Sequence, residues 1–396
     1  MTTEQGLVAR HAEELRRAVE DASRGLVQRE SLVELVVLCA VAREHLLVIG
    51  PPGTAKSEAV RRIARRLGGG YFEYLVGRFT EPTEIFGPIN LQKLKQGVVE
   101  AETRGMLPEA DIAFLDEVFL GSTAILNTLL AILNERRFRR GHTDLECPLR
   151  VCVGAANSLP EETQLAAFAD RFLVRQFVEP VGDTSLEALL EAGWSLGGGA
   201  LKPAPKSALQ ALDALSAAAL QVDMAPVRGD IAHAVRLLRR AGIEWTDRRI
   251  VRSQRLVAAS AVLAGRNAVS RADLWPLVFA LPTAEAQASG REVLAELLSE
   301  SANASLLSAA LESSLGARAR GTRLLHDGRA LLATRDTAAD AGAWQLAVEN
   351  LARDIDASFG SQNLEPELAA LRDEVVKLLG ERPADAGVTG PPDGSS

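Results

Sequence analysis

Aromatic residues, cysteines and long apolar runs are all scarce in this chain. Only 4% of its residues are aromatic, and stretches rich in Ala and Leu favour helices over a β-sandwich. The three cysteines (Cys39, Cys147, Cys152) form no metal-type pair, which suits buried thiols in a reducing cytoplasm. No apolar run approaches the roughly 18–20 residues that a spanning helix needs, and the charged N-terminus is unlike a signal peptide. We therefore expect a cytoplasmic protein.

The bulk composition is that of an ordinary globular protein. With 396 residues, 47% of them hydrophobic and 24% charged, the chain predicts about two or three domains with a sizeable core. Its net charge of −8 argues against a protein whose main task is binding nucleic acid. The five histidines show no metal-ligand spacing.

Short apolar segments alternate with amphipathic ones over the first 180 residues. This alternation predicts an α/β fold with a mainly parallel five-stranded sheet. The helical stretch before the first strand contains "SLVE", in which Ser31 and Glu34 fit a capping box. The predicted strands are residues 45–50, 71–77, 111–118, 151–157 and 172–180.

After Pro180 only helical patterns follow. We predict an α/β domain over 1–182, a helical domain over 183–285 and a further helical region over 286–382. Residues 383–396 are rich in Pro, Gly and Ser and predict a disordered tail. Truncation after about residue 285 is expected to leave nucleotide binding intact, because all the residues suited to phosphate chemistry precede it.

The segment "GPPGTAKS" follows the first predicted strand and precedes a helix. Gly50 and Gly53 can adopt the unusual dihedrals of a phosphate-binding loop, Lys56 would reach the β- and γ-phosphates of a nucleotide, and Ser57 would ligate Mg²⁺. Glycine-rich turns also arise by chance, but this placement favours a nucleotide site. The predicted cofactor-binding segment is Gly50, Pro51, Pro52, Gly53, Thr54, Ala55, Lys56, Ser57 and Glu58.

Ala55 stands where phosphate-binding loops usually carry a second glycine. If its dihedrals are already helical, alanine costs no backbone strain and is the better helix former. A substitution to glycine should then be tolerated.

Polar side chains follow two later strands. Asp116 and Glu117 end "IAFLDEV", where Asp116 could hold Mg²⁺ and Glu117 could polarise a water. Asn157 ends the next strand and could orient that water against the γ-phosphate. Taken singly, an Asp-Glu pair can merely cap a strand and an Asn can merely form a turn. Their order behind the loop favours a hydrolytic site.

The chain resembles the MoxR-type AAA+ ATPases, and most closely their RavA branch. The resemblance covers roughly residues 20–285, and alanine before the loop lysine is a familiar variant in that branch. It implies ATP hydrolysis with Mg²⁺ in a ring, expected to be a hexamer, that remodels or matures a client protein. It also implies an adaptor or client with a von Willebrand factor A domain. It rests on "LVIGPPGTAKS", "EIFGPINLQKLKQG", "LPEADIAFLDEV", "AILNTLLAILNERRFRRG", "VGAANSLPEE", "FADRFLVR" and "WTDRRIVRSQRLVAASAVLAGRNAVSRADL".

The resemblance assigns roles to further residues. Arg171 matches the arginine finger that a subunit inserts into its neighbour's site, although it could instead cap a helix or pair with Asp170. Arg248 matches the arginine of the helical lid (183–285) that contacts the γ-phosphate of its own subunit, with Arg249 as the alternative. In "GLVQRE", Val27 and Gln28 are candidates for packing against adenine.

Two basic clusters admit plainer interpretations. Four arginines at helical spacing predict a solvated helix face: Arg61, Arg62, Arg65 and Arg66. Four more lie in a predicted hairpin and could make protein contacts or salt bridges between subunits: Arg136, Arg137, Arg139 and Arg140. In the family, segments 86–97 and 136–148 match an inserted helix and a hairpin on the central side of the ring.

Two other functions are compatible with these residues. One is a nucleotide-gated scaffold with negligible turnover, and the other is a nucleic-acid motor, which DNA-stimulated turnover would support.

Overall fold

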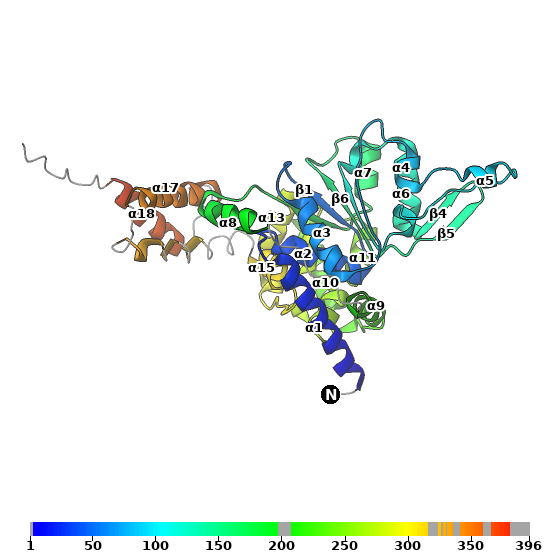
Figure 1. The fold of residues 1–396 in the computed structure, drawn as a ribbon. Helices are drawn as coiled ribbons and strands as arrows, with labels where there is room; N and C mark the ends of the chain where they lie inside the picture. Colours follow the sequence, from blue (N-terminus) through cyan, green and yellow to red (C-terminus); the bar gives the residue numbers. More distant parts are fainter. Residues whose placement is uncertain are drawn as a thin grey trace, which may run out of the picture. The chain divides into compact units, whose positions relative to one another are not determined.

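The computed structural model (Figure 1) divides the chain into two compact units, 1–181 with 187–316, and 182–186 with 317–396. Residues that the structure describes are 3–196, 207–315, 324–325, 328–329, 331–335, 341–358 and 366–380. The predicted tail, 383–396, lies outside them. No helix in the described part of the chain is both long and apolar enough to cross a membrane.

The first unit is built on a five-stranded parallel sheet, which confirms the predicted α/β fold. The strand order is β2-β3-β6-β1-β7, and every adjacent pair in that order is parallel. Parallel strands need crossover connections, which the intervening helices supply. The strands are β1 (Leu46–Ile49), β2 (Tyr71–Leu75), β3 (Ile112–Asp116), β6 (Val151–Ala156) and β7 (Val174–Phe177).

Both faces of the sheet are buried because alternate side chains point to opposite sides. In β1, Leu46 and Val48 join one apolar cluster, whereas Leu47 and Ile49 join the other. The first cluster includes α1 (Thr3–Ser23), α2 (Glu30–Ala42) and α3 (Lys56–Leu67). The second includes α6 (Thr123–Glu135), α7 (Thr163–Ala169) and the short α4 (Pro82–Phe86).

The inserted helix and the hairpin lie side by side in Figure 1. They are α5 (Leu91–Leu94) and the antiparallel pair β4 (Arg137–Arg140) and β5 (Thr143–Glu146). The backbone N–H of His142 donates to the Val99 carbonyl at 2.7 Å, and that of Ala101 donates to Thr143 Oγ1 at 2.8 Å. The two segments, more than forty residues apart, are therefore joined by hydrogen bonds.

Most of the helices after the sheet share its core, whereas α8 (Leu186–Leu196) has no buried residue among its described side chains. Leu212 of α9, Leu256 of α11 and Phe279 of α12 belong to the same apolar cluster as β1 and α2. The expected boundary at residue 285 does not separate compact units, because Leu294, Leu298 and Leu306 are also buried in this cluster. The helices are α8 (Leu186–Leu196), α9 (Ser207–Ala219), α10 (Ala225–Arg240), α11 (Asp247–Leu263), α12 (Pro276–Phe279), α13 (Ala284–Val293), α14 (Ala295–Leu298) and α15 (Leu307–Leu315).

The second unit has an apolar cluster of its own. Its helices α17 (Ala341–Ser358) and α18 (Pro366–Gly380) bring together Leu351, Ile355 and Leu371. The unit also includes the 3₁₀ turn η3 (Asp183–Ser185), against which α17 packs.

The predicted capping box at Ser31 and Glu34 is wrong. Helix α2 already begins at Glu30, and its N-cap residue, Arg29, makes no side-chain capping bond. Glu34 is buried, and its carboxylate accepts the backbone N–H groups of Ser308 (3.2 Å) and Ala309 (2.6 Å). Glu34 therefore caps the start of α15 rather than that of its own helix.

The arginines of α3 do not form one solvated face. Arg65 is exposed, but Arg62 is buried and donates to Glu58 (2.9 Å) and to the Arg24 carbonyl (2.6 Å). Arg66 is also buried and forms an ion pair with Asp21 of α1. Two of the four arginines, Arg62 and Arg66, thus bind α1 and the turn after it to α3.

Candidate nucleotide-binding and hydrolysis site

The loop of residues 50–57 is fixed at the carboxyl end of β1. The backbone N–H of Gly50 donates to the Ala156 carbonyl at 3.1 Å. A Cβ atom on Gly50 would lie 2.2 Å from the Val178 carbonyl oxygen, so only glycine fits here. Gly53 has a φ of 78°, a conformation that glycine adopts without strain. Both glycines are thus required by the path of the loop.

Lys56 is buried at the point where the loop becomes α3. Its ammonium group donates to the carbonyls of Gly50 (2.6 Å) and Pro51 (3.0 Å). Burial lowers the pKa of Lys56, while the carboxylates of Asp116 and Glu117 act in the opposite direction. The N–H groups of the first turn of α3 have no acceptor within the helix, and the helix dipole favours an anion beside them. A lysine and free N–H groups at one helix start fit a phosphate group.

Ala55 is not in a right-handed helical conformation, contrary to our expectation. Its φ of 59° and ψ of 25° place it in the left-handed region. That region costs an L-residue with a Cβ roughly 1–2 kcal/mol. Alanine is therefore strained here, and the glycine that usually occupies this position would not be.

Arg29 is a residue of this site that the sequence did not reveal. Its side chain is buried and donates to the carbonyls of Thr54 (2.7 Å) and Glu179 (2.7 Å), as well as to that of Gln28 (2.6 Å). It thereby ties the predicted adenine segment, Val27 and Gln28, to the phosphate loop. No motif marks such a residue, because its acceptors are backbone carbonyls in distant segments.

The structure brings the polar residues of two neighbouring strands together. Asp116 ends β3, and its Oδ1 accepts the backbone N–H of Glu117 at 3.1 Å. Asn157 follows β6, and its Nδ2 donates to Glu117 Oε1 at 2.6 Å. Glu117 has a φ of 51°, and such backbone strain is concentrated at functional sites in proteins.

Glu117 also borders an open pocket of about 490 Å³. Three apolar residues in its lining are exposed: Leu75 (66%), Phe79 (96%) and Leu120 (41%). Thus the Glu117 carboxylate is accessible from outside the unit, at the edge of the sheet where β2 and β3 end.

Glu58 faces away from this chemistry. Its carboxylate accepts from Arg61 (3.0 Å) and Arg62 (2.9 Å), so its side chain is already engaged. Ser57, one residue before it, is the second residue of α3.

Arg171 lies at the opposite edge of the sheet from the phosphate loop. Because β1 and β7 are parallel, the loop that follows β1 and the turn that precedes β7 are at opposite ends. Four strand residues, roughly 13 Å, separate these ends. The Arg171 Nε atom is buried and has no hydrogen-bond partner among the described residues. The structure does not bring this side chain to the phosphate loop of its own chain.

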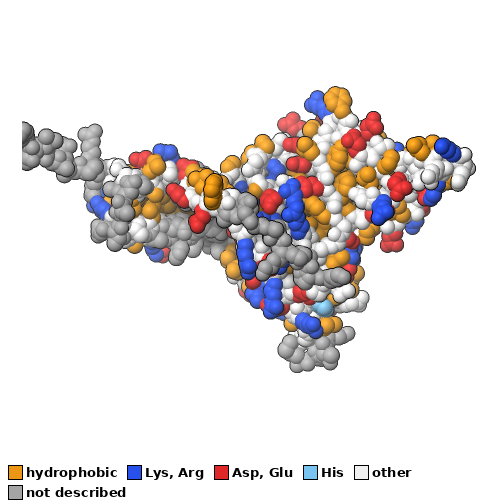
Figure 2. Space-filling model, viewed as in Figure 1, with side chains coloured by type: hydrophobic (Ala, Val, Ile, Leu, Met, Phe, Trp, Pro, Cys, Tyr) orange, Lys and Arg blue, Asp and Glu red, His pale blue; other side chains and the backbone are white. Residues whose placement is uncertain are grey.

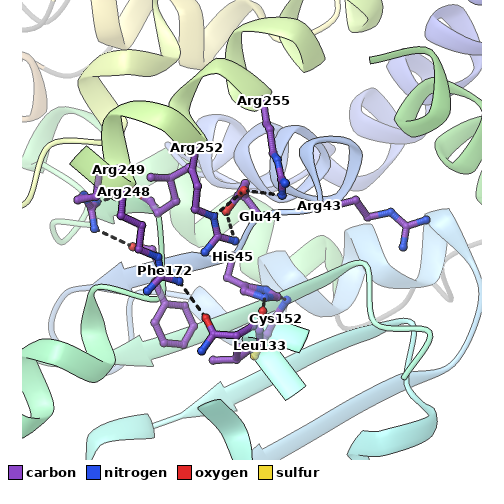
Figure 3. Close-up of polar contacts among 12 residues, drawn as sticks. Arg43, Glu44, His45, Leu133, Cys152, Phe172, Arg248, Arg249, Arg252 and Arg255 are labelled. Carbon is purple, nitrogen blue, oxygen red and sulfur yellow. Dashed lines mark hydrogen bonds and ion pairs between the residues drawn. The ribbon is translucent and has the colours of Figure 1, made fainter. Parts of the chain in front are cut away.

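The structure distinguishes Arg248 from Arg249 (Figure 3). Arg249 is buried, and its guanidinium donates to Asp170 Oδ1 and to the carbonyls of Phe172, Leu173 and Ala280. Arg248 is half-buried and donates to Asn134 Oδ1 at 2.9 Å, at the far end of α6. Its Nη1 has no partner in the described part of the chain.

In this conformation Arg248 therefore contacts α6, and its expected contact with the γ-phosphate of its own subunit stays a prediction. Helix α6 begins next to the carboxyl end of β3, and Asn134 is in its last turn, about 16 Å along the helix axis. Arg248 instead shares the amino-terminal edge of the sheet with Arg171.

Arg136 is not part of the hairpin surface. It has a φ of 55° and ends α6, and its guanidinium donates to the carbonyls of Leu133 (3.0 Å) and Arg43 (3.0 Å) beside the buried His45. Burial lowers the pKa of Arg136 to about 10. Arg137 and Arg139 do lie exposed on the hairpin, where both pair with Asp144.

A strand–loop–helix with a buried lysine, followed by acidic and amide residues at two adjacent strand ends, defines the class of P-loop AAA+ proteins. Comparison with known proteins narrows this class. Residues 13–217, just over half of the chain, match the family described as the MoxR domain in the MoxR-vWA-beta-propeller ternary systems. The chain therefore belongs to this MoxR family of AAA+ ATPases.

Individual proteins are also similar to the chain. An uncharacterized protein of Methanocaldococcus jannaschii is 35% identical over 262 residues, which are 66% of this chain and 69% of the relative. Chaperone MoxR1 of Mycobacterium tuberculosis is 28% identical over 175 residues, 43% of this chain and 45% of that protein. The crystal structure of a candidate ATPase from Cytophaga hutchinsonii has a TM-score of 0.60 at 16% identity, covering 75% of this chain and 97% of that one. It shows the shared fold.

Proposed function

We propose that this protein hydrolyses ATP to ADP and phosphate and uses the reaction to remodel or mature a partner protein. The observation that carries this proposal is the 2.6 Å hydrogen bond from Asn157 to Glu117, next to a buried lysine at the start of a helix. Such a carboxylate can accept a proton from water while the amide fixes its orientation.

Each residue then has a defined task. Lys56 and the first N–H groups of α3 bind the phosphates, and Ser57 and Asp116 would hold Mg²⁺. When bound, that ion neutralises charge on the phosphate oxygens. Glu117 takes the proton of the attacking water, and Asn157 holds the Glu117 carboxylate in place. Val27 and Gln28 are proposed to pack against the adenine.

The position of Arg171 supports a ring, which we propose to be a hexamer. A guanidinium stabilises the charge of the transferring phosphoryl group, but Arg171 lies at the wrong edge of the sheet to serve its own site. We therefore propose that it serves the site of a neighbouring subunit. We propose the same for Arg248, which lies at the same edge, as an alternative to the expected contact within its own subunit.

The partner is proposed from the family. The MoxR domains it matches come from systems that also contain vWA and β-propeller proteins, so we propose a client or adaptor with a vWA domain. On the motifs quoted above we propose a RavA-like member, and on its cysteine usage a cytoplasmic one. On the face in Figure 2, acidic side chains lie among the basic ones, which does not favour a nucleic-acid motor.

Glu117→Gln tests the reaction. The amide keeps the shape of the side chain but cannot accept a proton, so we expect normal ATP binding and a fall in phosphate release of about 10²–10⁴-fold. The matched control is Glu20→Gln on the exposed face of α1, which should hydrolyse ATP at the wild-type rate. Ready turnover by Glu117→Gln would remove Glu117 from the reaction, and negligible turnover by the wild type would favour a nucleotide-gated scaffold.

Mixing two inactive variants tests the action of Arg171 on a neighbour. Arg171→Ala should bind ATP and lose about 10³–10⁵ in rate. In a mixed ring, an Arg171→Ala subunit keeps its own Glu117 and receives Arg171 from a Glu117→Gln neighbour. Partial activity should therefore return once subunits exchange. If exchange is shown by native mass spectrometry and no activity returns, Arg171 does not act in this way.

A further inference from the structure

The contacts of Arg249 surround the residue proposed to act on the neighbouring subunit. Its Nη1 donates to Asp170 Oδ1 at 3.0 Å and to the Phe172 carbonyl at 3.3 Å, and its Nη2 donates to the Leu173 carbonyl at 2.6 Å. These acceptors immediately precede and follow Arg171 in the chain. A single guanidinium thus holds the turn that presents Arg171 from both sides.

The same guanidinium is also bound to the helices of the lid. Its Nε donates to the Ala280 carbonyl at 3.0 Å, and the Trp245 indole N–H donates to that carbonyl at 3.2 Å. Arg249 itself lies in the first turn of α11. It therefore bridges α11, the end of α12 and the turn before β7 with four hydrogen bonds in one rigid plane.

Helix α11 is fixed to the sheet by a second row of contacts (Figure 3). Arg252, one turn after Arg248 and Arg249, donates to Glu44 Oε1 at 2.9 Å and forms an ion pair with Glu44 Oε2 at 2.6 Å. Glu44 is fully buried and directly precedes β1 through His45. Consequently α11, the start of β1 and the turn carrying Arg171 form one connected structure.

We propose that Arg249 is a positioning residue for Arg171, so that the lid helix α11 of one subunit sets the place of the arginine which that subunit inserts into its neighbour's site. This inference rests on the proposed function. The proposal also gives Arg249 a role other than contact with phosphate. Its guanidinium is already occupied by hydrogen bonds to four acceptors.

Arg249→Lys is the first test. The ammonium keeps the charge but makes at most three hydrogen bonds and lacks the planar geometry, so it cannot hold both sides of the turn and Ala280. A displacement of about 1 Å at a reacting group can cost about 10²-fold in rate. We expect phosphate release to fall about 10²-fold while ATP binding stays within twofold of the wild type.

The mixing experiment separates positioning from a general structural role. Arg249→Lys subunits have an intact site of their own, so activity should return on mixing with Glu117→Gln, as it does for Arg171→Ala. Mixing Arg249→Lys with Arg171→Ala should restore nothing, because neither supplies a placed arginine. If Arg249 only maintained the fold, the receiving site would be damaged too, and mixing with Glu117→Gln would not help.

Two further variants keep the test decisive. Asp170→Asn removes the charged acceptor of Arg249 at a partly exposed position, and should show a smaller loss with the same mixing pattern even if Arg249→Lys does not fold. Arg255→Lys is the control: it is the same substitution on the same helix, at a half-exposed side chain 3.4 Å from Glu44, and should leave turnover unchanged.

The outcomes distinguish this inference from the proposal on which it rests. If Arg171→Ala and Glu117→Gln restore activity together but folded Arg249→Lys and Asp170→Asn do not recover with Glu117→Gln, the positioning role is refuted and the action of Arg171 on the neighbour stands. Wild-type turnover by both variants refutes it equally. If Arg171→Ala and Glu117→Gln fail to complement despite exchange, both ideas fall.

Discussion

At the scale of single residues, three of the five non-glycine residues with positive φ in the described part of the chain lie in the candidate site. Gln28, Ala55 and Glu117 all have positive φ values although none is glycine. They lie in the adenine segment, the phosphate loop and the candidate catalytic strand end, respectively. Each such conformation costs of order 1–3 kcal/mol and persists only when the surrounding structure enforces it. Here the loop is enforced by Arg29, which binds the carbonyls of Gln28 and Thr54.

Ala55→Gly should relieve part of this strain. Glycine occupies the left-handed region without the cost that alanine incurs there, which stabilises the folded state by roughly 1–2 kcal/mol. Glycine also gives the unfolded chain more conformational freedom, which stabilises the unfolded state by about 0.4–1 kcal/mol. We therefore expect the free energy of unfolding to rise by up to about 1.6 kcal/mol, with unchanged ATP affinity. Chemical denaturation would measure this.

The same substitution at Ala64, inside α3, is the control. Ala64 is buried and helical, so glycine should lower the free energy of unfolding by at least about 1 kcal/mol. A loss of equal size at both positions would show that Ala55 is not strained in solution.

Residues at strand ends were predictable, and residues that bind carbonyls were not. Glu117 and Asn157 each follow an apolar strand, and parallel strands of one sheet end at the same edge, so their contact follows from the pattern. Arg29 and Arg249 act on carbonyl groups of segments far away in sequence. Every residue has such a carbonyl, so no residue type signals the contact.

At the scale of elements, one carboxylate connects two helices. Glu34 projects from α2 and caps α15 through the N–H groups of Ser308 and Ala309. Burial is the main cause that raises its pKa to about 7, and the nearby charge of Glu30 acts in the same direction, while the hydrogen bonds oppose it. The local pattern suggested a capping box because Ser31 and Glu34 have the right spacing. Tertiary packing gave the side chain a different helix to cap.

This carboxyl group should make stability depend on pH. Its folded pKa is above the ordinary value, so its contribution is complete below about pH 4.5 and is lost as the pH rises through about 7. Relative to Glu34→Gln, which does not titrate, the wild type should lose roughly 2–3 kcal/mol of unfolding free energy between pH 5 and pH 8. Urea denaturation of both proteins at the two pH values gives the difference. If the unfolding free energy of the wild type minus that of Glu34→Gln stays constant or increases from pH 5 to pH 8, the burial of this group is contradicted.

At the scale of the whole molecule, the lid is not an independent body in this conformation. Leu212, Leu256 and Phe279 pack in the cluster that also contains β1 and α2, and the arginines of α11 bind the edge where β1 and β7 begin. The change of pattern at Pro180 correctly indicated where strands give way to helices. It could not locate the limit of the compact unit, because helical segments inside and outside a core have the same periodicity.

The true limit of this unit predicts where the chain can be cut. The boundary expected from the sequence, residue 285, lies inside α13, whereas the first compact unit extends to residue 316. A cut after 285 would remove Leu294, Leu298 and Leu306, all buried. At roughly 1.5–3 kcal/mol for each leucine, the loss rivals the 5–15 kcal/mol by which domains are stable. It would also remove Gln287, whose side chain donates to the Arg175 carbonyl at 2.9 Å, and the helix that Glu34 caps.

We therefore expect truncation after residue 316 to give a folded protein that binds ATP with wild-type affinity, and truncation after 285 to give one that unfolds or aggregates. Circular dichroism melting curves and binding of a fluorescent ATP analogue would compare the two. Retained binding by the shorter protein, with an unchanged melting temperature, would mean that α13–α15 cover the core without supporting it. Loss of binding by the longer one would instead assign residues 317–396 a part in the nucleotide site, although every candidate phosphate ligand precedes them.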